Sequence, residues 1–270
     1  MPMIHLKTAA SLALSMALVA ILTTPAAGAE TRPIKALLVA GGCCHDYAQQ
    51  KDVLKLGLEA RAFIQVDIVY AKDDSTRPKL PIYGNPNYAK GYDVVIHDEC
   101  SADVSDPEVI QGVLQPHRDG VPGVNLHCAM HCYRFGDFGK PVIAGAPNAR
   151  WYEYLGLHSS GHGAQKPIAI KFLDPANWVI KGMADWTTIN EELYNNIEVA
   201  GDTTRLATGT QEGEAKAPVV VWSHLYGDKK TRVFSTTIGH NNETVSDPRY
   251  LDLVTRGLLW AVNRPDVLKN

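Results

Sequence analysis

The sequence predicts an α/β protein built on a flavodoxin-like, three-layer, doubly wound and mainly parallel sheet. Three observations indicate this class: short apolar segments, helical segments that alternate with them, and glycine-rich turns at the ends of the apolar segments. Unbroken apolar runs are typical of strands covered on both faces. Regular alternation of strand and helix is the pattern of right-handed crossover units in a parallel sheet.

The first elements follow this pattern closely. An apolar strand is predicted at 34–40, and it ends at Gly41. Residues 46–63 have helical spacing, and 64–70 alternate as a second strand. A connection rich in proline and asparagine, 73–91, is too polar for the core and long enough to overhang a site.

The later elements repeat the alternation and then become richer in strands. A helix is predicted from Asp106, which can cap it, with Pro107 at its first position. The remaining predicted strands are 93–97, 121–126, 168–172, 219–223 and 232–237, and a helix at 250–262 closes the chain.

Residues 1–29 have the three-part layout of a secretory signal peptide, with small residues before Glu30. The apolar run 9–22 is shorter than the ~20 residues that cross a bilayer. We therefore expect cleavage after Ala29 and export to the periplasm or the extracellular space. The mature chain, 30–270, is expected to be a single domain without stable membrane insertion.

Charge argues against one class of partner, and the cysteine content leaves several roles for these residues open. The 26 Lys and Arg residues and 29 Asp and Glu residues give a net charge of −3, and no basic cluster suggests a nucleic-acid partner. Five cysteines leave at least one unpaired within the chain. They remain open to three interpretations: buried apolar side chains, disulfides such as Cys128 with Cys132, or ligands of a soft metal. The adjacent Cys43 and Cys44 are expected to make a strained pair.

Histidines stand at the ends of several predicted strands. His45, His127 and His240 each follow a strand, and ligands bind beyond the carboxyl ends of parallel strands. His127 and His131 are four residues apart, the spacing with which one helix holds a metal ion. A divalent transition metal such as zinc, bound by His45, His127 and His131, is therefore an open alternative. Histidines expected to be structural are His97, His117 and His224.

Carboxylates near these histidines could orient an imidazole or act as a base. Glu99 follows His97, and Glu191 and Glu192 precede Tyr194, although Glu191 is also open to being a solvated side chain. His158 and His162 share the four-residue spacing, but Ser159-Ser160-Gly161 predicts a loop there. The segment from Trp186 to Tyr194 suits a surface loop or one that faces a sugar.

Taken together, these motifs resemble the ThuA-like (trehalose-utilisation) family, from Ile34 to Asn263. The resemblance implies a fold like that of class I glutamine amidotransferases. In amidotransferase relatives, a nucleophilic cysteine occupies the sharp turn after a strand. Here His127 stands at that turn and Cys128 comes one position later, so no Cys-dependent mechanism is expected. The matching segments are Gly41-Gly42 with His45, Leu126–Ala129, Gly161-His162, Glu191–Tyr194, Val233-Phe234 with Gly239-His240, Glu243-Thr244, Asp247–Arg249 and Arg256–Ala261.

The resemblance further implies an enzyme of carbohydrate catabolism, a hydrolase or lyase acting on glycosides or 3-keto glycosides. It would use histidine and carboxylate acid–base chemistry, with or without a metal, on a small sugar or sugar derivative. A metal-dependent hydrolase of another substrate class and a non-catalytic carbohydrate-binding protein remain alternatives. The residues assigned to catalysis are His127, Glu192 and His240, and those assigned to substrate binding are His45, Asn125, His162 and Glu99.

Overall fold

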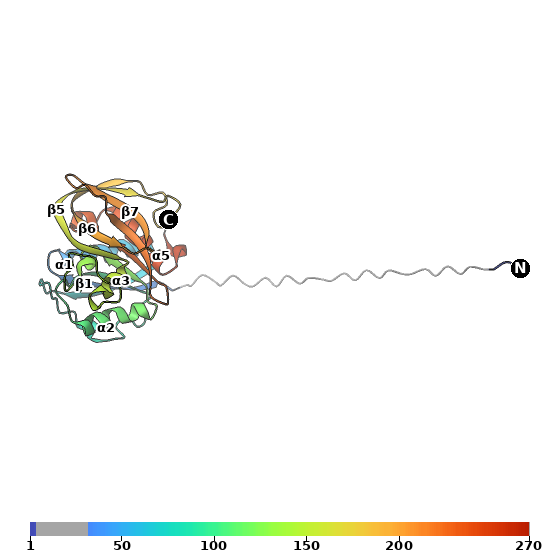
Figure 1. The fold of residues 1–270 in the computed structure, drawn as a ribbon, viewed down its shortest axis with the longest axis horizontal. Helices are drawn as coiled ribbons and strands as arrows, with labels where there is room; N and C mark the ends of the chain where they lie inside the picture. The colour runs from blue at the N-terminus through green and yellow to red at the C-terminus, as the bar shows by residue number, and fades with distance from the viewer. Residues whose placement is uncertain (4–31, 270) are drawn as a thin grey trace. The chain divides into compact units, whose positions relative to one another are not determined.

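The computed structural model describes residues 1–3 and 32–269, and Arg32–Asn270 form one compact unit. Apart from its first three residues, the predicted signal peptide lies outside the described residues. One sheet of nine strands runs through the unit in the order β2-β1-β3-β4-β9-β8-β7-β5-β6. Figure 1 shows β5, β6 and β7 together in one part of the unit. The strands are β1 (Ile34–Gly42), β2 (Ile64–Ala71), β3 (Val94–Cys100), β4 (Gly123–Leu126), β5 (Leu157–Phe172), β6 (Trp186–Val199), β7 (Thr204–Gln211), β8 (Val219–Tyr226) and β9 (Thr231–Thr236).

One half of the sheet is parallel and is covered on both faces. Strands β2, β1, β3, β4 and β9 run in the same direction. Successive side chains of β1 enter different cores: Leu38 packs with the core that includes α1 (Tyr47–Arg61) and α5 (Pro248–Ala261), and Leu37 packs with the core that includes α2 (Pro107–Arg118). This division explains why these strands read as unbroken apolar runs.

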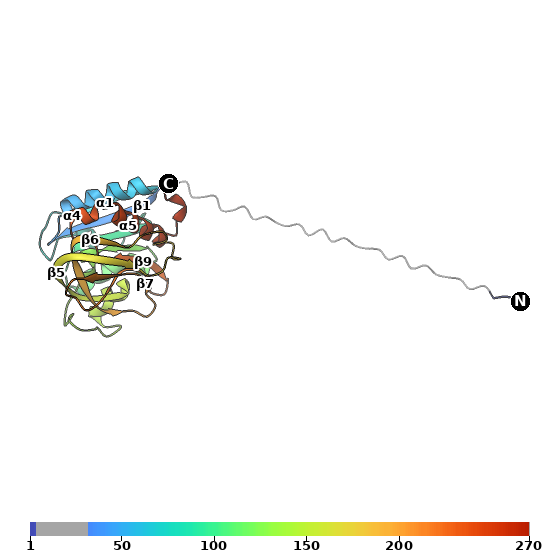
Figure 2. The same ribbon diagram turned by 90° about the horizontal axis from the view of Figure 1, so that it is seen from above.

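The helices form layers on the two faces of the parallel half. Figure 2 shows α1, α4 (Asn242–Val245) and α5 together on one side of β1. α2 and α3 (Arg150–Leu155) contact each other within the other core. Short 3-10 helices complete the described structure: η1 (Pro81–Gly84), η2 (His127–His131), η3 (Pro147–Ala149) and η4 (Pro265–Val267). Among the described residues, no helix is long and apolar enough to cross a membrane.

The other half of the sheet corrects the sequence prediction. Strands β8, β7, β5 and β6 are joined by antiparallel pairings, so the sheet is mixed rather than mainly parallel. Strands β6 and β7 were not predicted, and β5 begins at Leu157, which places His158 and His162 on a strand instead of a loop. Exposed residues interrupt the buried ones along β5 and β6, so these strands lack the apolar run that identified β1.

Aspartates and prolines fix where the long helices begin. The side chain of Asp46 accepts a hydrogen bond from the backbone N–H of Gln49 at the start of α1. Asp106 and Asp247 cap α2 and α5 in the same way, each followed by a proline at the first helical position. The capped start of α5 follows directly on α4 and the loop that carries His240, so it anchors that side of the candidate site.

Candidate functional site

His127 stands at the turn where β4 ends. Its φ of 42° lies in the left-handed region that residues other than glycine seldom adopt. Its Nδ1 donates a hydrogen bond to the carbonyl oxygen of Thr237, at 2.7 Å. Its other ring nitrogen, Nε2, faces Glu192 and lies 3.4 Å from the carboxylate oxygen Oε2. The fixed orientation of this ring makes Nε2 suitable as a base or as a metal ligand.

Glu192, on β6, lies among three imidazoles. One carboxylate oxygen, Oε2, is 3.4 Å from Nε2 of His127 and 3.5 Å from Nε2 of His162. The other, Oε1, is 3.3 Å from Nδ1 of His240. Burial alone would raise the pKa of Glu192, but hydrogen bonds with His127 and His240 outweigh it and hold the pKa well below its usual value. The carboxylate is therefore ionised at neutral pH, and its hydrogen bond raises the pKa of His240.

His45 completes the cluster from the turn after β1. Its ring meets the rings of His127 and His240 edge-on, with both pairs of ring centroids 4.7 Å apart. Burial, together with the neighbouring His127 and His240, lowers the pKa of His45 to about 2, so the ring is neutral. Its Nδ1 is buried and has no hydrogen-bond partner. A buried, unpartnered lone pair is what a metal ion or a substrate hydroxyl group would satisfy.

One ligand atom from each of His45, His127 and His240 lies within 4.8 Å of the other two. Three imidazole nitrogens form a typical ligand set for catalytic zinc. The hydrogen bond from His127 to Thr237 is the kind of supporting contact that orients a metal-binding histidine. These residues could therefore hold a divalent transition metal.

Glu191 was left open as a solvated side chain, yet it is fully buried. Its Oε2 accepts hydrogen bonds from the backbone N–H groups of Gly239, at 3.3 Å, and His240, at 2.9 Å. Its Oε1 accepts one from the N–H of Asn241, at 3.1 Å. Glu191 thus fixes the loop that carries His240. Sequence reasoning missed this role, and the adjacent Glu191-Glu192 pair was the only signal for it.

Two cavities lie next to the cluster. The larger, of about 660 Å³, is open and polar, and its walls include His45, His240 and Asn242. The second, of about 580 Å³, has His162 and Tyr194 in its wall. Because Glu192 lies near both His240 and His162, side chains in contact with it reach into each cavity.

The proposed metal ligand His131 is not part of this cluster. The segment 127–131 forms a 3-10 helix, in which residues four apart do not share a face. Nε2 of His131 lies 2.9 Å from Oγ of Ser159, and its ring stacks flat on Tyr194, with centroids 4.1 Å apart. The ligand set that the structure assembles is therefore His45, His127 and His240 rather than His45, His127 and His131.

Two residues assigned to substrate binding also lie elsewhere. Glu99 is fully buried and accepts hydrogen bonds from the hydroxyl groups of Tyr83, at 2.7 Å, and Tyr133, at 3.0 Å. Asn125 is fully buried and donates a hydrogen bond to Oγ of Ser235, at 3.1 Å. Both residues were placed at strand ends from the sequence, but their side chains point into the core.

The structural histidines match their predicted role. His97 and His117 are fully buried and lie 3.0 Å apart through their Nε2 atoms. Nδ1 of His117 donates a hydrogen bond to the carbonyl oxygen of Val121, at 2.7 Å. Nε2 of His224 bonds the carbonyl oxygen of Glu153, at 3.1 Å.

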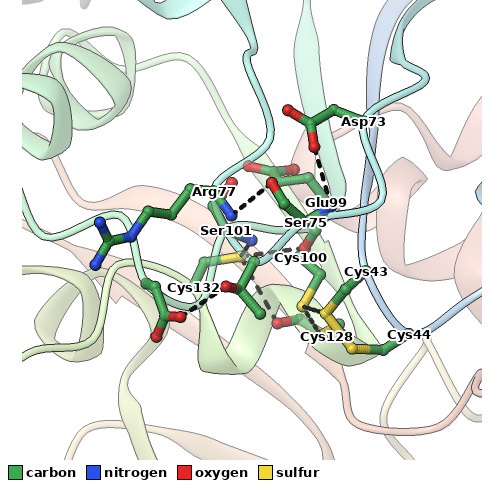
Figure 3. Close-up of a disulfide and its surroundings, with 12 residues drawn as sticks. Cys43, Cys44, Asp73, Ser75, Arg77, Glu99, Cys100, Ser101, Cys128 and Cys132 are labelled. Atoms are coloured by element: carbon green, nitrogen blue, oxygen red, sulfur yellow. Dashed lines mark hydrogen bonds between the residues drawn. A yellow bond between two sulfur atoms is a disulfide. The ribbon is translucent and has the colours of Figure 1, made fainter.

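Cysteine pairing differs from the suggested example. Cys43 and Cys44 form a disulfide, and Cys128 is not bonded to Cys132 (Figure 3). The sulfur of Cys128 points toward Cys100.

Comparison with known proteins gives one family and a shared fold. The ThuA family profile, described as trehalose utilisation, matches residues 35–261. A ThuA-like protein from Parabacteroides merdae ATCC 43184 has a similar structure, with a TM-score of 0.64 and 20% identity over 88% of this chain and 92% of that chain. A ThuA-like protein from Bacteroides uniformis ATCC 8492 gives 0.62 and 15% over 91% and 98%.

A glutamine amidotransferase from Thermotoga maritima also aligns, with a TM-score of 0.41 and 11% identity over 85% of this chain and 96% of that chain. No curated protein matches the sequence.

Proposed function

This chain belongs to the ThuA family of trehalose utilisation, and on that premise we propose that it is an enzyme of carbohydrate catabolism. The proposed substrates are glycosides or 3-keto glycosides, which would enter the cavities beside the histidines. The observation that carries the proposal is the position of Glu192, whose oxygens lie within 3.5 Å of three imidazoles. A carboxylate in contact with several imidazoles can accept a proton and pass it on.

The proposed reaction is elimination from a 3-keto glycoside. A base removes the proton from the carbon beside the carbonyl group, the electron pair forms an enediolate, and the aglycone leaves from the next carbon with a proton. We assign the base to Glu192. His240 contacts it and also lines the larger cavity, so it is suited to return the proton to the leaving group.

The histidines also support assistance by a metal. The enediolate carries a developing negative charge. His45 has a buried Nδ1 without a hydrogen-bond partner, and a hydrogen bond to Thr237 fixes the ring of His127. A divalent metal such as zinc, held by His45, His127 and His240, would act as a Lewis acid that stabilises that charge. In that case His240 would be a metal ligand, and Glu192, which also lies near His162, would handle the proton.

The two cavities suit a substrate with two parts. His240 belongs to the wall of one cavity and His162 to that of the other, and both lie near Glu192. A glycoside has this form, with a sugar on one side of the bond that breaks and an aglycone on the other. Both cavities are lined by polar groups that can bind hydroxyl groups, including Asn242 in one and Asn195 in the other.

Turnover of glycosides by matched variants tests this proposal. Purified protein, with and without added zinc, is incubated with trehalose, 3-keto trehalose and a panel of related glycosides, and the products are identified by mass spectrometry. Replacing Glu192→Gln keeps the shape but removes the base, and is expected to lower kcat by about 10²-fold or more. Glu198→Gln changes an exposed carboxylate on the same strand and should leave the rate unchanged. Equal rates in both variants would contradict the assignment.

The same assay separates the alternatives. Elimination yields an unsaturated ketone that absorbs ultraviolet light, whereas a hydrolase yields a saturated sugar. Binding of a sugar without any product would identify a non-catalytic carbohydrate-binding protein.

Export is also part of the proposal. It is supported by the composition of residues 1–29, which has the form of a signal peptide. N-terminal sequencing of the protein recovered outside the cytoplasm is expected to begin at Glu30. Recovery of the intact N-terminus from the cytoplasm alone would contradict export.

A further inference from the structure

Four cysteines from three neighbouring strand ends bring their sulfur atoms together (Figure 3). Cys43 follows β1, Cys100 ends β3, and Cys128 follows β4. The register explains the first contact: Gly42, the last residue of β1, pairs with Cys100 on β3, so Cys43 lies beside Cys100. The sulfur of Cys43, which is bonded to Cys44, lies 3.6 Å from that of Cys100.

The contact continues inward to Cys128. Its sulfur lies 2.6 Å from that of Cys100 and donates a hydrogen bond to it. This separation is only about half an ångström longer than a disulfide bond of about 2.05 Å. A small shift of either side chain would therefore bring the two sulfur atoms to bonding distance.

The four sulfur atoms also run from the surface into the core. Cys44 is exposed and lies in the wall of the larger cavity, whereas Cys43 is half-buried. Cys100 and Cys128 are buried, with 2% and 6% of their surfaces exposed. An exposed disulfide is thus in contact with a buried pair of thiols.

We propose that Cys43, Cys44, Cys100 and Cys128 form a thiol–disulfide exchange site, in which one disulfide moves between the exposed Cys43–Cys44 pair and the buried Cys100–Cys128 pair. The exchange is internal and needs no oxidant or reductant from outside the chain. It goes beyond the proposed sugar chemistry and does not depend on it.

The first step is attack of Cys100 on Cys43. Cys100 loses its proton to solvent, a bond forms between the sulfur atoms of Cys43 and Cys100, and the Cys43–Cys44 bond breaks. The electron pair of that bond leaves on Cys44, which takes a proton from solvent. Because Cys44 is exposed, water can stabilise the departing thiolate.

The second step is attack of Cys128 on Cys100. Cys128 gives up its proton, the Cys100–Cys128 bond forms, and the Cys43–Cys100 bond breaks. The electron pair leaves on Cys43, which takes up one proton. The overall change moves two protons from the buried thiols to the outer pair and leaves the total number of disulfides unchanged.

Two further observations favour this direction of attack. The hydrogen bond from Cys128 lowers the pKa of Cys100, which increases its thiolate fraction. Cys44 has a φ of 82°, a conformation that residues other than glycine rarely adopt. Opening the Cys43–Cys44 ring frees Cys44 to leave this conformation.

Cys132 is buried nearby but is held by other groups. Its thiol donates to the carbonyl oxygen of Glu99, at 3.1 Å, and its sulfur accepts the backbone N–H of Ser101, at 3.0 Å. A serine at this position can make both hydrogen bonds. Cys132→Ser is therefore the matched control for changes in the exchanging cysteines.

Disulfide mapping without reductant tests the exchange. The purified chain is incubated with iodoacetamide at pH 8, sampled over time, digested with trypsin and examined by mass spectrometry. Cleavage at Lys51, Arg118 and Arg134 puts the Cys43-Cys44 pair, Cys100 and Cys128 on separate peptides. The expected product carries two alkyl groups on the Cys43-Cys44 peptide together with a Cys100–Cys128 cross-link.

The variants give different outcomes. Cys100→Ser should lose the reaction and keep the Cys43–Cys44 disulfide, whereas Cys132→Ser should react like the natural chain. Cys128→Ser should stop after the first step, with Cys43 linked to Cys100 and a single alkyl group on Cys44. This trapped intermediate tests the proposal even if Cys100→Ser fails to fold. An unreacted Cys43–Cys44 disulfide in the natural chain, or equal reaction in Cys100→Ser, would overturn the proposal.

Discussion

The buried carboxylate of Glu191 accepts a hydrogen bond from the backbone N–H of His240, with an oxygen-to-nitrogen distance of 2.9 Å. The next residue, Glu192, lies 3.3 Å from the side chain of the same histidine. Adjacent carboxylates thus hold the two ends of one residue, the first through its backbone and the second through its imidazole. The first fixes where the loop lies, and the second raises the pKa of the ring through a hydrogen bond.

Removing the charge of Glu191 should therefore disturb His240 without touching its side chain. Glu191→Gln loses one acceptor oxygen for three backbone N–H groups, and should lower the free energy of unfolding by about 2 kcal/mol. Turnover should fall as well, because the His240 loop is no longer fixed. Urea unfolding and the glycoside assay measure the two effects. Glu212→Gln, at an exposed position, is the control, and an equal loss there would refute the special role of Glu191.

Metal content should distinguish a site formed by His45, His127 and His240 from one that uses His127 and His131 of the 3-10 helix. After zinc loading and dialysis, elemental analysis should find zinc in the natural protein and little in His240→Ala. His131→Phe keeps a ring stacked on Tyr194 and should retain the metal. Loss of zinc from His131→Phe but not from His240→Ala would instead favour His127 with His131.

Buried His117 should make the fold sensitive to mild acid. Burial, together with the neighbouring His97, lowers its pKa to about 3, while the unfolded value is about 6.5. Below pH 6.5 the unfolded chain takes up a proton that the folded chain refuses, so the free energy of unfolding falls by up to about 1.4 kcal/mol per pH unit until the pH approaches 3. The free energy of unfolding is measured by urea titration at pH 7.5, 6 and 5. It should fall less steeply with decreasing pH in His117→Gln than in the natural protein, and an identical dependence on pH would count against this explanation.

Packing of α5 on the sheet should not tolerate a methyl group at Gly257. A Cβ atom there would collide with the ring of Phe234 on β9. Gly257→Ala should lower the free energy of unfolding by about 1–3 kcal/mol despite the better helix propensity of alanine. At Gly201 a Cβ would meet nothing within 4 Å, so Gly201→Ala should change stability little in the same urea titration. Comparable losses in both variants would argue against a steric cause.

The sequence predicted the parallel half of the fold because burial on both faces leaves a clear pattern. Strands β1, β3 and β4 and helices α1, α2 and α5 lie close to their predicted ranges. Strand β6 was missed because exposed polar residues interrupt its buried ones, which also describes a loop. The antiparallel half joins strands that mostly follow one another in the chain, and only the pairing of β5 with β7 skips a strand.

The site could be predicted for residues whose place in the backbone is enough to bring them close to one another. His45, His127 and His240 follow strands that end at one edge, and the structure brings them together. The direction of a side chain could not be predicted from the sequence. Glu99 and Asn125 were therefore expected at the site, although their side chains lie in the core.

The central position of β9 has a consequence for synthesis. This strand is the last in the chain, yet it lies between β4 and β8 and joins the parallel half of the sheet to the antiparallel half. A ribosome releases the chain from its N-terminus, so the two halves cannot be joined until residues 231–236 have been made. Pairing between segments far apart in sequence is also slow. The two halves of the sheet therefore stay unjoined while residues 1–230 are synthesised, and the parallel half must wait for its last strand.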